Sequence, residues 1–157
     1  MPAMGLESRA RDEVTDYLGT IITGTVGVDA HVIGTKVISR ALRDAGFKVV
    51  ELGAQTPAEE FIMAAQETAA DAMLISSLYG MAELDLEGFR AKCTEAGLED
   101  IILYVGGILG VSRRDFAADE TKFKAMGFDR VYPPEADIRA AIEDLKGDLS
   151  RKQAERP

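Results

Sequence analysis

Several residue types are scarce in this chain, and each scarcity excludes a class of protein. The 157 residues include one cysteine, one histidine and no tryptophan. A single cysteine, Cys93, excludes an internal disulfide and a cysteine-rich metal cage. Apolar runs such as residues 101–105 are too short to span a bilayer or to form the core of a signal peptide. We therefore expect a cytoplasmic protein with no membrane partner.

Positive charge is also in short supply. Lysine and arginine contribute 18 residues against 27 aspartates and glutamates, for a net charge of -9. A chain of this charge repels a phosphate backbone, and no Lys/Arg cluster offsets that repulsion, so we expect no nucleic-acid partner. With 46% apolar and 29% charged residues, the composition resembles that of an average globular protein. The length suits one domain, which we predict over residues 19–149, with an N-terminal extension over 1–18 and a mobile C-terminal tail over 150–157.

Short apolar segments alternate with amphipathic ones along the rest of the chain. The apolar segments predict five strands, at residues 20–27, 47–52, 72–76, 101–105 and 130–132. Helical spacing of apolar residues predicts five helices, at residues 33–45, 57–70, 85–96, 115–126 and 134–149. Strands that alternate with helices in this way run parallel, with right-handed crossovers and helices on both faces. The predicted fold class is α/β: a doubly wound, five-stranded parallel sheet of flavodoxin-like (Rossmann-like) type, with strand order 2-1-3-4-5.

Two local patterns add detail to the predicted helices. Thr56, followed three residues later by Glu59, is typical of a capping box at a helix start. Cys93 shares a helical face with Leu86 and Phe89, so we expect a buried core thiol rather than a reactive one.

The one histidine falls in the loop after the first predicted strand, in the pattern Asp29-x-His31-x-x-Gly34. Ligands of doubly wound sheets bind at the carboxyl ends of the strands, so this loop lies where a ligand is expected. An imidazole binds a metal through one nitrogen while the other donates to a carboxylate, a role open to Asp29. Gly34 lets the backbone approach a bulky group closely. Taken alone, the pattern fits equally a loop histidine held by a neighbouring acid.

Two further loops are predicted at the same edge of the sheet. Ser76 ends the third strand two residues before Leu78, and its hydroxyl can bond a nitrogen heterocycle. Gly106 and Gly107 follow the fourth strand, where missing side chains open a slot for a ligand tail. Each segment alone is also typical of an ordinary turn. Together the three loops line one crevice.

In combination, these residues resemble the three-part signature of the cobalamin-binding domains. The matching segments are Asp29-x-His31-x-x-Gly34, Ser76-x-Leu78 and Gly106-Gly107. The resemblance implies that His31 replaces the dimethylbenzimidazole base of the cofactor as the lower axial ligand of cobalt. It implies that Asp29 bonds the imidazole and that Ser76 contacts the displaced base. The glycine pair then provides the slot for the nucleotide tail.

Within that family, residues 20–149 resemble the small subunits of glutamate mutase (methylaspartate mutase). That resemblance implies adenosylcobalamin as cofactor and an isomerase activity, the reversible radical rearrangement of L-glutamate to 3-methylaspartate. It also implies a larger, TIM-barrel subunit that holds the substrate, in a heterotetramer of two small and two large subunits. No catalytic residue for the rearrangement is then expected in this chain, which is inactive without its large subunit.

Two alternatives share parts of the pattern. Corrinoid proteins of methyltransferase systems carry the same Asp-x-His-x-x-Gly motif, but usually after a helical domain, for which the first 19 or so residues are too few. A flavodoxin-like binding module without cobalt is the other alternative. Thr23-Gly24-Thr25 is similar to a flavin phosphate loop, but it lies within the first predicted strand. A phosphoacceptor receiver would need an aspartate where Ser76 stands.

Overall fold

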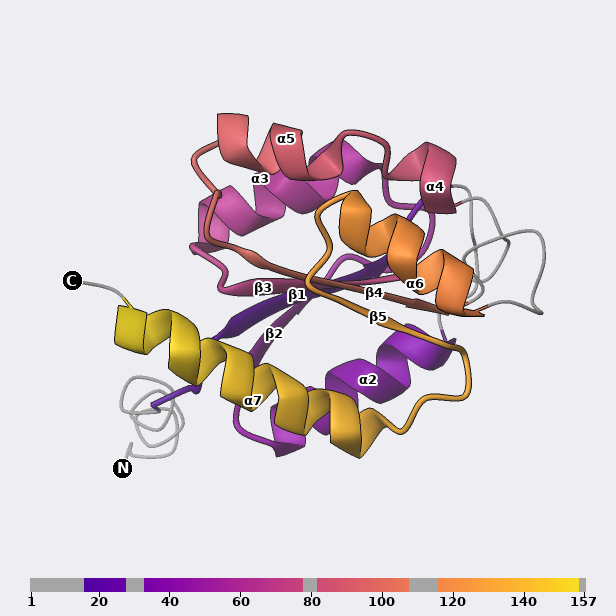
Figure 1. The fold of residues 1–157 in the computed structure, drawn as a ribbon. Helices are drawn as coiled ribbons and strands as arrows, with labels where there is room; N and C mark the ends of the chain where they lie inside the picture. Colours follow the sequence, from indigo (N-terminus) through magenta and orange to yellow (C-terminus); the bar gives the residue numbers. More distant parts are fainter. Residues whose placement is uncertain (1–15, 28–32, 78–81, 108–115, 156–157) are drawn as a thin grey trace, which may run out of the picture.

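A computed structural model of the chain describes residues 16–27, 33–77, 82–107 and 116–155. Five parallel strands form one sheet in the order β2-β1-β3-β4-β5 (Figure 1). The strands are β1 (Thr20–Thr25), β2 (Lys48–Glu51), β3 (Ala72–Ser77), β4 (Ile102–Gly107) and β5 (Arg130–Tyr132). The helices are α2 (Ile33–Asp44), α3 (Ala58–Thr68), α4 (Ala82–Asp85), α5 (Phe89–Glu95), α6 (Phe116–Ala125) and α7 (Ile138–Glu155). The predicted fold class and strand order are confirmed.

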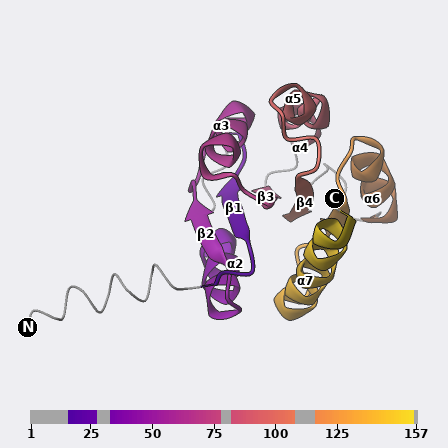
Figure 2. The same ribbon diagram turned by 90° about the vertical axis from the view of Figure 1, so that its left-hand side faces the viewer.

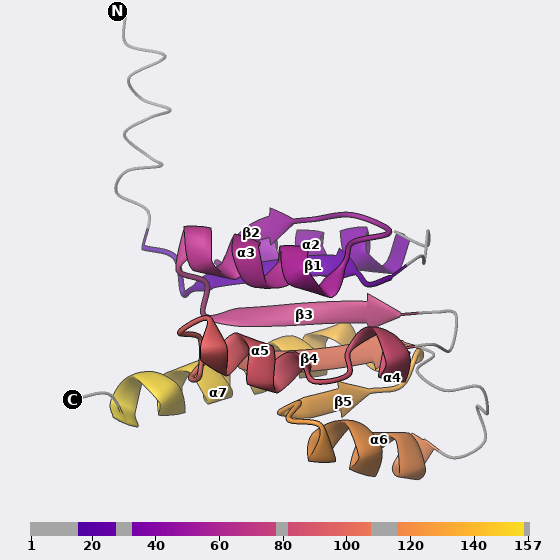
Figure 3. The same ribbon diagram turned by 90° about the horizontal axis from the view of Figure 1, so that it is seen from above.

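Helices cover both faces of the sheet. Helices α2 and α7 lie on one face, the α2–α7 face, whereas α3, α4, α5 and α6 lie on the other, the α3–α6 face (Figures 1 and 2). Seen from above, α3 lies over β1 and α6 lies beside β5 at the edge of the sheet (Figure 3). Because both faces are covered, the side chains of the central strands β1 and β4 are mostly buried on both faces rather than alternately buried and exposed.

Each face has its own hydrophobic core, and successive strand residues contribute to opposite cores. Ile22 packs in the core of the α3–α6 face with Phe61 of α3, whereas its neighbour Ile21 packs on the α2–α7 face with Leu42 and Leu145. All five side chains are fully buried. Burial of a side chain of this size contributes about 1.5–3 kcal/mol relative to exposure. The sheet is therefore held from both sides.

The predicted capping box at the start of α3 is wrong. Pro57 is the N-cap residue, and no side chain caps the helix. The Thr56 hydroxyl instead donates backwards to loop carbonyl oxygens, among them that of Gly53 at 3.3 Å. The cause is that Thr56 forms a parallel bridge with Val26. The bridge holds the backbone of Thr56 extended and turns the Thr56 side chain away from the helix. The predicted bond from Glu59 is therefore not formed.

The single helix predicted over residues 85–96 begins later in the structure: α5 spans Phe89–Glu95, and α4, which precedes it, ends at Asp85. Gly88 separates them with a left-handed backbone, φ 72°. Glycine adopts a left-handed backbone conformation readily. A residue in that conformation interrupts the hydrogen-bonding pattern of a right-handed helix. The prediction failed here because the helical spacing of the apolar residues continues across the break.

Helix α7 differs from its predicted range at both ends. It begins at Ile138 rather than at residue 134, because Asp137 accepts a hydrogen bond from the backbone N–H of Arg139 at 3.0 Å and so caps the first turn. It continues to Glu155, so residues 150–155, predicted as part of a tail, are helical. The added turn is anchored by Lys152, whose Nζ donates to the carbonyl oxygen of Asp71 at 3.3 Å. No helix among the described residues is both long and apolar enough to cross a membrane.

Cys93 is fully buried in the core of the α3–α6 face, as predicted. Burial raises the pKa of its thiol to about 11, although the nearby Arg90 opposes the shift. A raised pKa leaves little of the reactive thiolate at pH 8. We expect the native protein to resist an aromatic disulfide reagent over minutes, while the urea-unfolded chain reacts at once. Stoichiometric reaction of the native protein within the mixing time would contradict this burial.

Candidate functional site

Three of the residues predicted to form a site lie together at the carboxyl edge of the sheet. Ser76 of β3 is paired in register with Gly106 of β4, and Gly107 follows beside Ser77. Gly106 is paired on its other side with Tyr132 of β5. The ends of three neighbouring strands therefore bring the predicted serine and the glycine pair side by side.

The other predicted residues lie at or beyond the limits of the described segments. Asp29, His31 and Leu78 lie outside the described residues, and Gly34 belongs to the first turn of α2. The described chain on the amino side of residues 28–32 lies at the same edge, because the Val26 N–H donates to the carbonyl oxygen of Ser76 at 3.1 Å. The described end of β1 therefore lies next to the serine.

A cavity of about 300 Å³ extends from this edge between the sheet and helices α2 and α7. This volume lies at the small end of the range for ligand pockets. Its sheet wall includes Leu74, Ser76 and Gly106, and its helical walls include Ile38 of α2 and Ile142 of α7. The wall is mostly aliphatic and aromatic. Such a cavity favours an apolar, flat group with few polar atoms.

The two glycines shape the wall of this cavity in different ways. A Cβ atom added to Gly106 would lie 3.4 Å from both the Cβ and the carbonyl oxygen of Tyr132, an ordinary van der Waals contact, and Gly106 itself lines the cavity. Gly107 has φ 107°, a backbone conformation that side chains rarely adopt. The backbone conformation therefore favours glycine at position 107, whereas at position 106 the missing side chain leaves the cavity wall open.

Two buried hydroxyl pairs attach α2 to β1 beside the cavity. Thr25 Oγ1 lies 3.0 Å from Thr35 Oγ1, and Thr23 Oγ1 lies 2.8 Å from Ser39 Oγ. All four side chains are buried, where a hydrogen bond offsets the cost of removing a hydroxyl from water. Thr35 also lines the cavity. The sequence analysis missed these pairs. The signal was available, because residues two apart in a strand share one face of the sheet and residues four apart in a helix share one face of the helix.

Two tyrosines that the sequence analysis did not select form another part of the wall. Tyr104 of β4 and Tyr132 of β5 line the cavity with their rings 5.5 Å apart and inclined by 54°. Tyr104 donates a hydrogen bond to Asp148 of α7, and Tyr132 donates to Asp144 of α7 at 2.7 Å. Burial raises the pKa of both phenols well above the ordinary value, so both hydroxyls stay protonated and act as donors.

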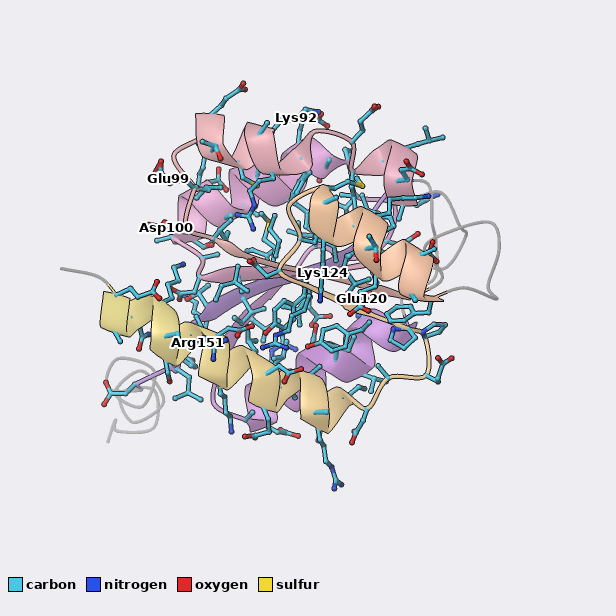
Figure 4. All side chains as sticks on the ribbon, viewed as in Figure 1. Lys92, Glu99, Asp100, Glu120, Lys124 and Arg151 are labelled. Atoms are coloured by element: carbon cyan, nitrogen blue, oxygen red, sulfur yellow. The ribbon has the colours of Figure 1, made fainter. Side chains whose placement is uncertain are left out.

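A second concave surface lies at the opposite, amino edge of the strands. Figure 4 shows Glu99 and Asp100 at this end of the molecule, away from α4. Its charges compensate one another: Arg90 Nη2 lies 3.0 Å from Asp129 Oδ2, for example. Among the described residues no group of at least three His, Cys, Asp or Glu side chains is arranged to hold a metal ion. The carboxyl edge, with its apolar cavity, is therefore the better candidate for a ligand site.

Comparison with known sequences identifies strong similarities. The family described as B12 binding domain matches residues 19–145. A glutamate mutase sigma subunit of Carboxydothermus hydrogenoformans is 53% identical over 129 residues, which cover 82% of this chain and 94% of that protein. One from Clostridium cochlearium is 50% identical over 131 residues, 83% of this chain and 96% of that protein. The match to these sigma subunits thus spans nearly their whole length.

Solved structures support the fold independently of close sequence similarity. The monomethylamine corrinoid protein of Methanosarcina barkeri superposes with a TM-score of 0.68 at 20% identity, over 92% of this chain and 65% of that one. The receiver domain of the response regulator NarL from Mycobacterium tuberculosis superposes with a TM-score of 0.63 at 14% identity, over 86% of this chain and 98% of that one. This chain thus spans just under two thirds of the corrinoid protein. At such identities the similarity establishes the fold alone.

Proposed function

The chain belongs to the B12-binding domain family, among its glutamate mutase sigma subunits, and we propose from this membership that it is the cobalamin-binding subunit of an adenosylcobalamin-dependent glutamate mutase. The reaction is the radical rearrangement of L-glutamate to 3-methylaspartate, and the enzyme class is isomerase. The single observation that supports this most strongly is the 53% identity to a sigma subunit over 94% of its length.

The described residues fit the proposed cofactor. An apolar cavity at the carboxyl edge suits the displaced dimethylbenzimidazole base and its nucleotide tail, and Gly106 leaves the space that a Cβ atom would reduce. In this proposal Ser76 contacts the base, Gly107 and Gly34 allow close backbone approach, and Leu78 borders the same crevice. The cofactor supplies homolysis of a cobalt–carbon bond, which no protein side chain provides.

The remaining roles in the proposal belong to the histidine loop. His31 would hold the cobalt through one imidazole nitrogen, and Asp29 would accept a hydrogen bond from the other. Such a carboxylate fixes the tautomer and raises the basicity of the ligating nitrogen. In this proposal the chain would bind and orient the cofactor, and the acid or base for the substrate is expected in the partner subunit.

The substrate, in this proposal, binds to a partner. We propose a larger TIM-barrel subunit that presses glutamate against the upper face of the cofactor, in a cytoplasmic heterotetramer of two small and two large subunits. The designation of the relatives as sigma subunits supports the need for another subunit. Without it the chain is expected to bind cobalamin but to rearrange no glutamate.

His31→Ala tests the proposed axial ligation. Titration of the purified chain with hydroxocobalamin is expected to shift the spectrum from the base-off form to a histidine-bound form. His31→Ala should abolish that shift and weaken binding about tenfold or more, as loss of a group that supports a metal site does. Asp29→Asn, which keeps a side chain of the same size, should retain the shift with weaker binding.

The outcomes of this titration separate the proposal from its rivals. Identical spectra for the native chain and His31→Ala would exclude histidine ligation. No binding of cobalamin by either protein would exclude the cofactor. Growth of a methyl–cobalt spectrum on addition of a methyl donor would favour a methyltransferase corrinoid protein instead. Circular dichroism of both variants controls for the fold.

A further inference from the structure

The two edge strands of the sheet are protected in different ways. Helix α6 lies beside β5 at one edge (Figure 3). At the other edge, no strand among the described residues pairs with the outer side of β2 (Figure 2). An exposed edge strand presents unpaired backbone N–H and C=O groups, with which another chain can pair. The β2 edge is therefore the open end of the sheet.

Alternate residues of β2 direct their backbone groups outward. The N–H group of Lys48 donates to the carbonyl oxygen of Gly19 at 2.9 Å, and that of Leu52 donates toward β1 in the same way. Since backbone groups alternate between the two sides of a strand, those of Val49 and Glu51 face away from β1. A second copy of β2 that runs antiparallel, with its Glu51 opposite Val49, can bond both residues through their N–H and C=O groups.

Arg43 of α2 lies across these outward groups. Its Nη2 donates to the carbonyl oxygen of Val49 at 3.4 Å, and its Nη1 lies 2.8 Å from Glu51 Oε2. Lys36 of the same helix approaches the Glu51 carboxylate from 3.8 Å. The Glu51 side chain is only 25% exposed, so the ion pair is partly shielded from water. The guanidinium is therefore held over the edge of the strand rather than extended into solvent.

We propose that the β2 edge is a self-association surface for a second copy of this chain, and that Arg43 keeps this surface closed. A second strand reaches the Val49 carbonyl only when it displaces the guanidinium from that oxygen and from Glu51. The displaced charge then lies beside the new strand pair with part of its water removed, which is unfavourable. Charged side chains at edge strands commonly protect against such pairing. The inference concerns the chain alone and does not depend on a bound cofactor.

Arg43→Ala tests the role of the guanidinium. Alanine is a strong helix former, so α2 is expected to form as before. We expect the variant to self-associate at least about tenfold more tightly than the native chain, the effect of roughly one added hydrogen bond. Sedimentation equilibrium of the full chain over a series of concentrations measures the association. A variant that associates no more tightly than the native chain would overturn the proposal.

Arg40→Ala is the matched control on the same helix. The Arg40 side chain is 82% exposed, and its Nε lies 3.6 Å from Asp44 Oδ2 of α2 rather than over β2. Both substitutions remove one positive charge from a chain of negative net charge, which increases the repulsion between copies. Arg40→Ala is therefore expected to associate no more than the native chain. Equal self-association of the two variants would show that the position over β2 is irrelevant, and would overturn the proposal.

Glu51→Pro in the Arg43→Ala background locates the contact. Proline has no N–H group, and it is tolerated in an edge strand where that group faces outward. The proline removes a donor that a second copy of β2 requires, so we expect the double variant to return to the native level of association. Circular dichroism controls for the fold. Undiminished association of the folded double variant would place the contact elsewhere and overturn its assignment to β2.

Discussion

Replacement of Gly106 by valine is expected to weaken cobalamin binding about 100-fold without destabilising the fold. Position 106 lies on a strand between Ser76 and Tyr132, and a Cβ atom there already meets Tyr132 at 3.4 Å. The two methyl groups of valine therefore extend into the cavity, where the cofactor tail is proposed to lie. A 100-fold loss corresponds to about 2.7 kcal/mol, within the range for forcing extra atoms into a packed site. Spectral titration with hydroxocobalamin measures the loss.

The same substitution should be neutral or favourable for the free protein. Valine is preferred in strands, whereas glycine loses more backbone freedom on folding. The thermal midpoint of Gly106→Val is therefore expected to equal or exceed that of the native chain. Gly106→Ala is the graded control, with a loss of affinity of only a few fold. Native affinity in the valine variant would place the tail elsewhere.

Truncation of Phe61 to alanine is expected to remove about 3–5 kcal/mol from the free energy of unfolding. Phe61 of α3 is fully buried, and its ring lies so close to β1 that a Cβ atom on Gly24 would meet it at 2.9 Å. The ring thus fills the space that a glycine leaves in the central sheet. Its loss leaves a cavity that backbone atoms on the sheet side cannot close. Urea unfolding followed by circular dichroism measures the change.

Met63 provides the matched control on the same helix. Its side chain is 55% exposed, and Met63→Ala is expected to change the unfolding free energy by less than about 0.5 kcal/mol. Because Phe61 packs on the α3–α6 face, Phe61→Ala should still bind cobalamin at temperatures where it is folded. If Phe61→Ala lowered the free energy of unfolding by less than about 1 kcal/mol, the effect would be of the size expected at an exposed site. That result would contradict the assignment of Phe61 to the core.

The sequence predicted the sheet well because its strands carry a strong signal. Segments such as Ile21–Ile22 and residues 101–105 are short, apolar and bounded by polar or glycine residues, which leaves little choice but buried parallel strands. The strand order then makes the strands of Ser76 and Gly106 neighbours, and both residues lie near the carboxyl ends of their strands. Periodicity could not reveal the break at Gly88, because it depends on one backbone angle rather than on polarity.

The site was only partly predictable, for a related reason. Motif residues at strand ends, such as Ser76 and the glycine pair, stand out in sequence because loops after strands carry function. The tyrosine wall does not stand out. Tyr104 and Tyr132 look like ordinary core aromatics until the structure brings Asp144 and Asp148, more than ten residues away, to their hydroxyls. The helical extension beyond residue 149 was missed similarly, since Lys152 bonds a carbonyl 81 residues away.

In the proposed function, the cavity between the sheet and helices α2 and α7 makes the cofactor part of the hydrophobic interior. On this face the core would surround a space that the cofactor completes, whereas the core of the opposite face includes the fully buried rings of Phe61 and Phe89. Binding to the folded chain alone stabilises it by mass action, by about 2.7 kcal/mol at a free ligand concentration of 100 Kd. We therefore expect the chain without cofactor to unfold more often than the loaded chain and to be more exposed to proteases.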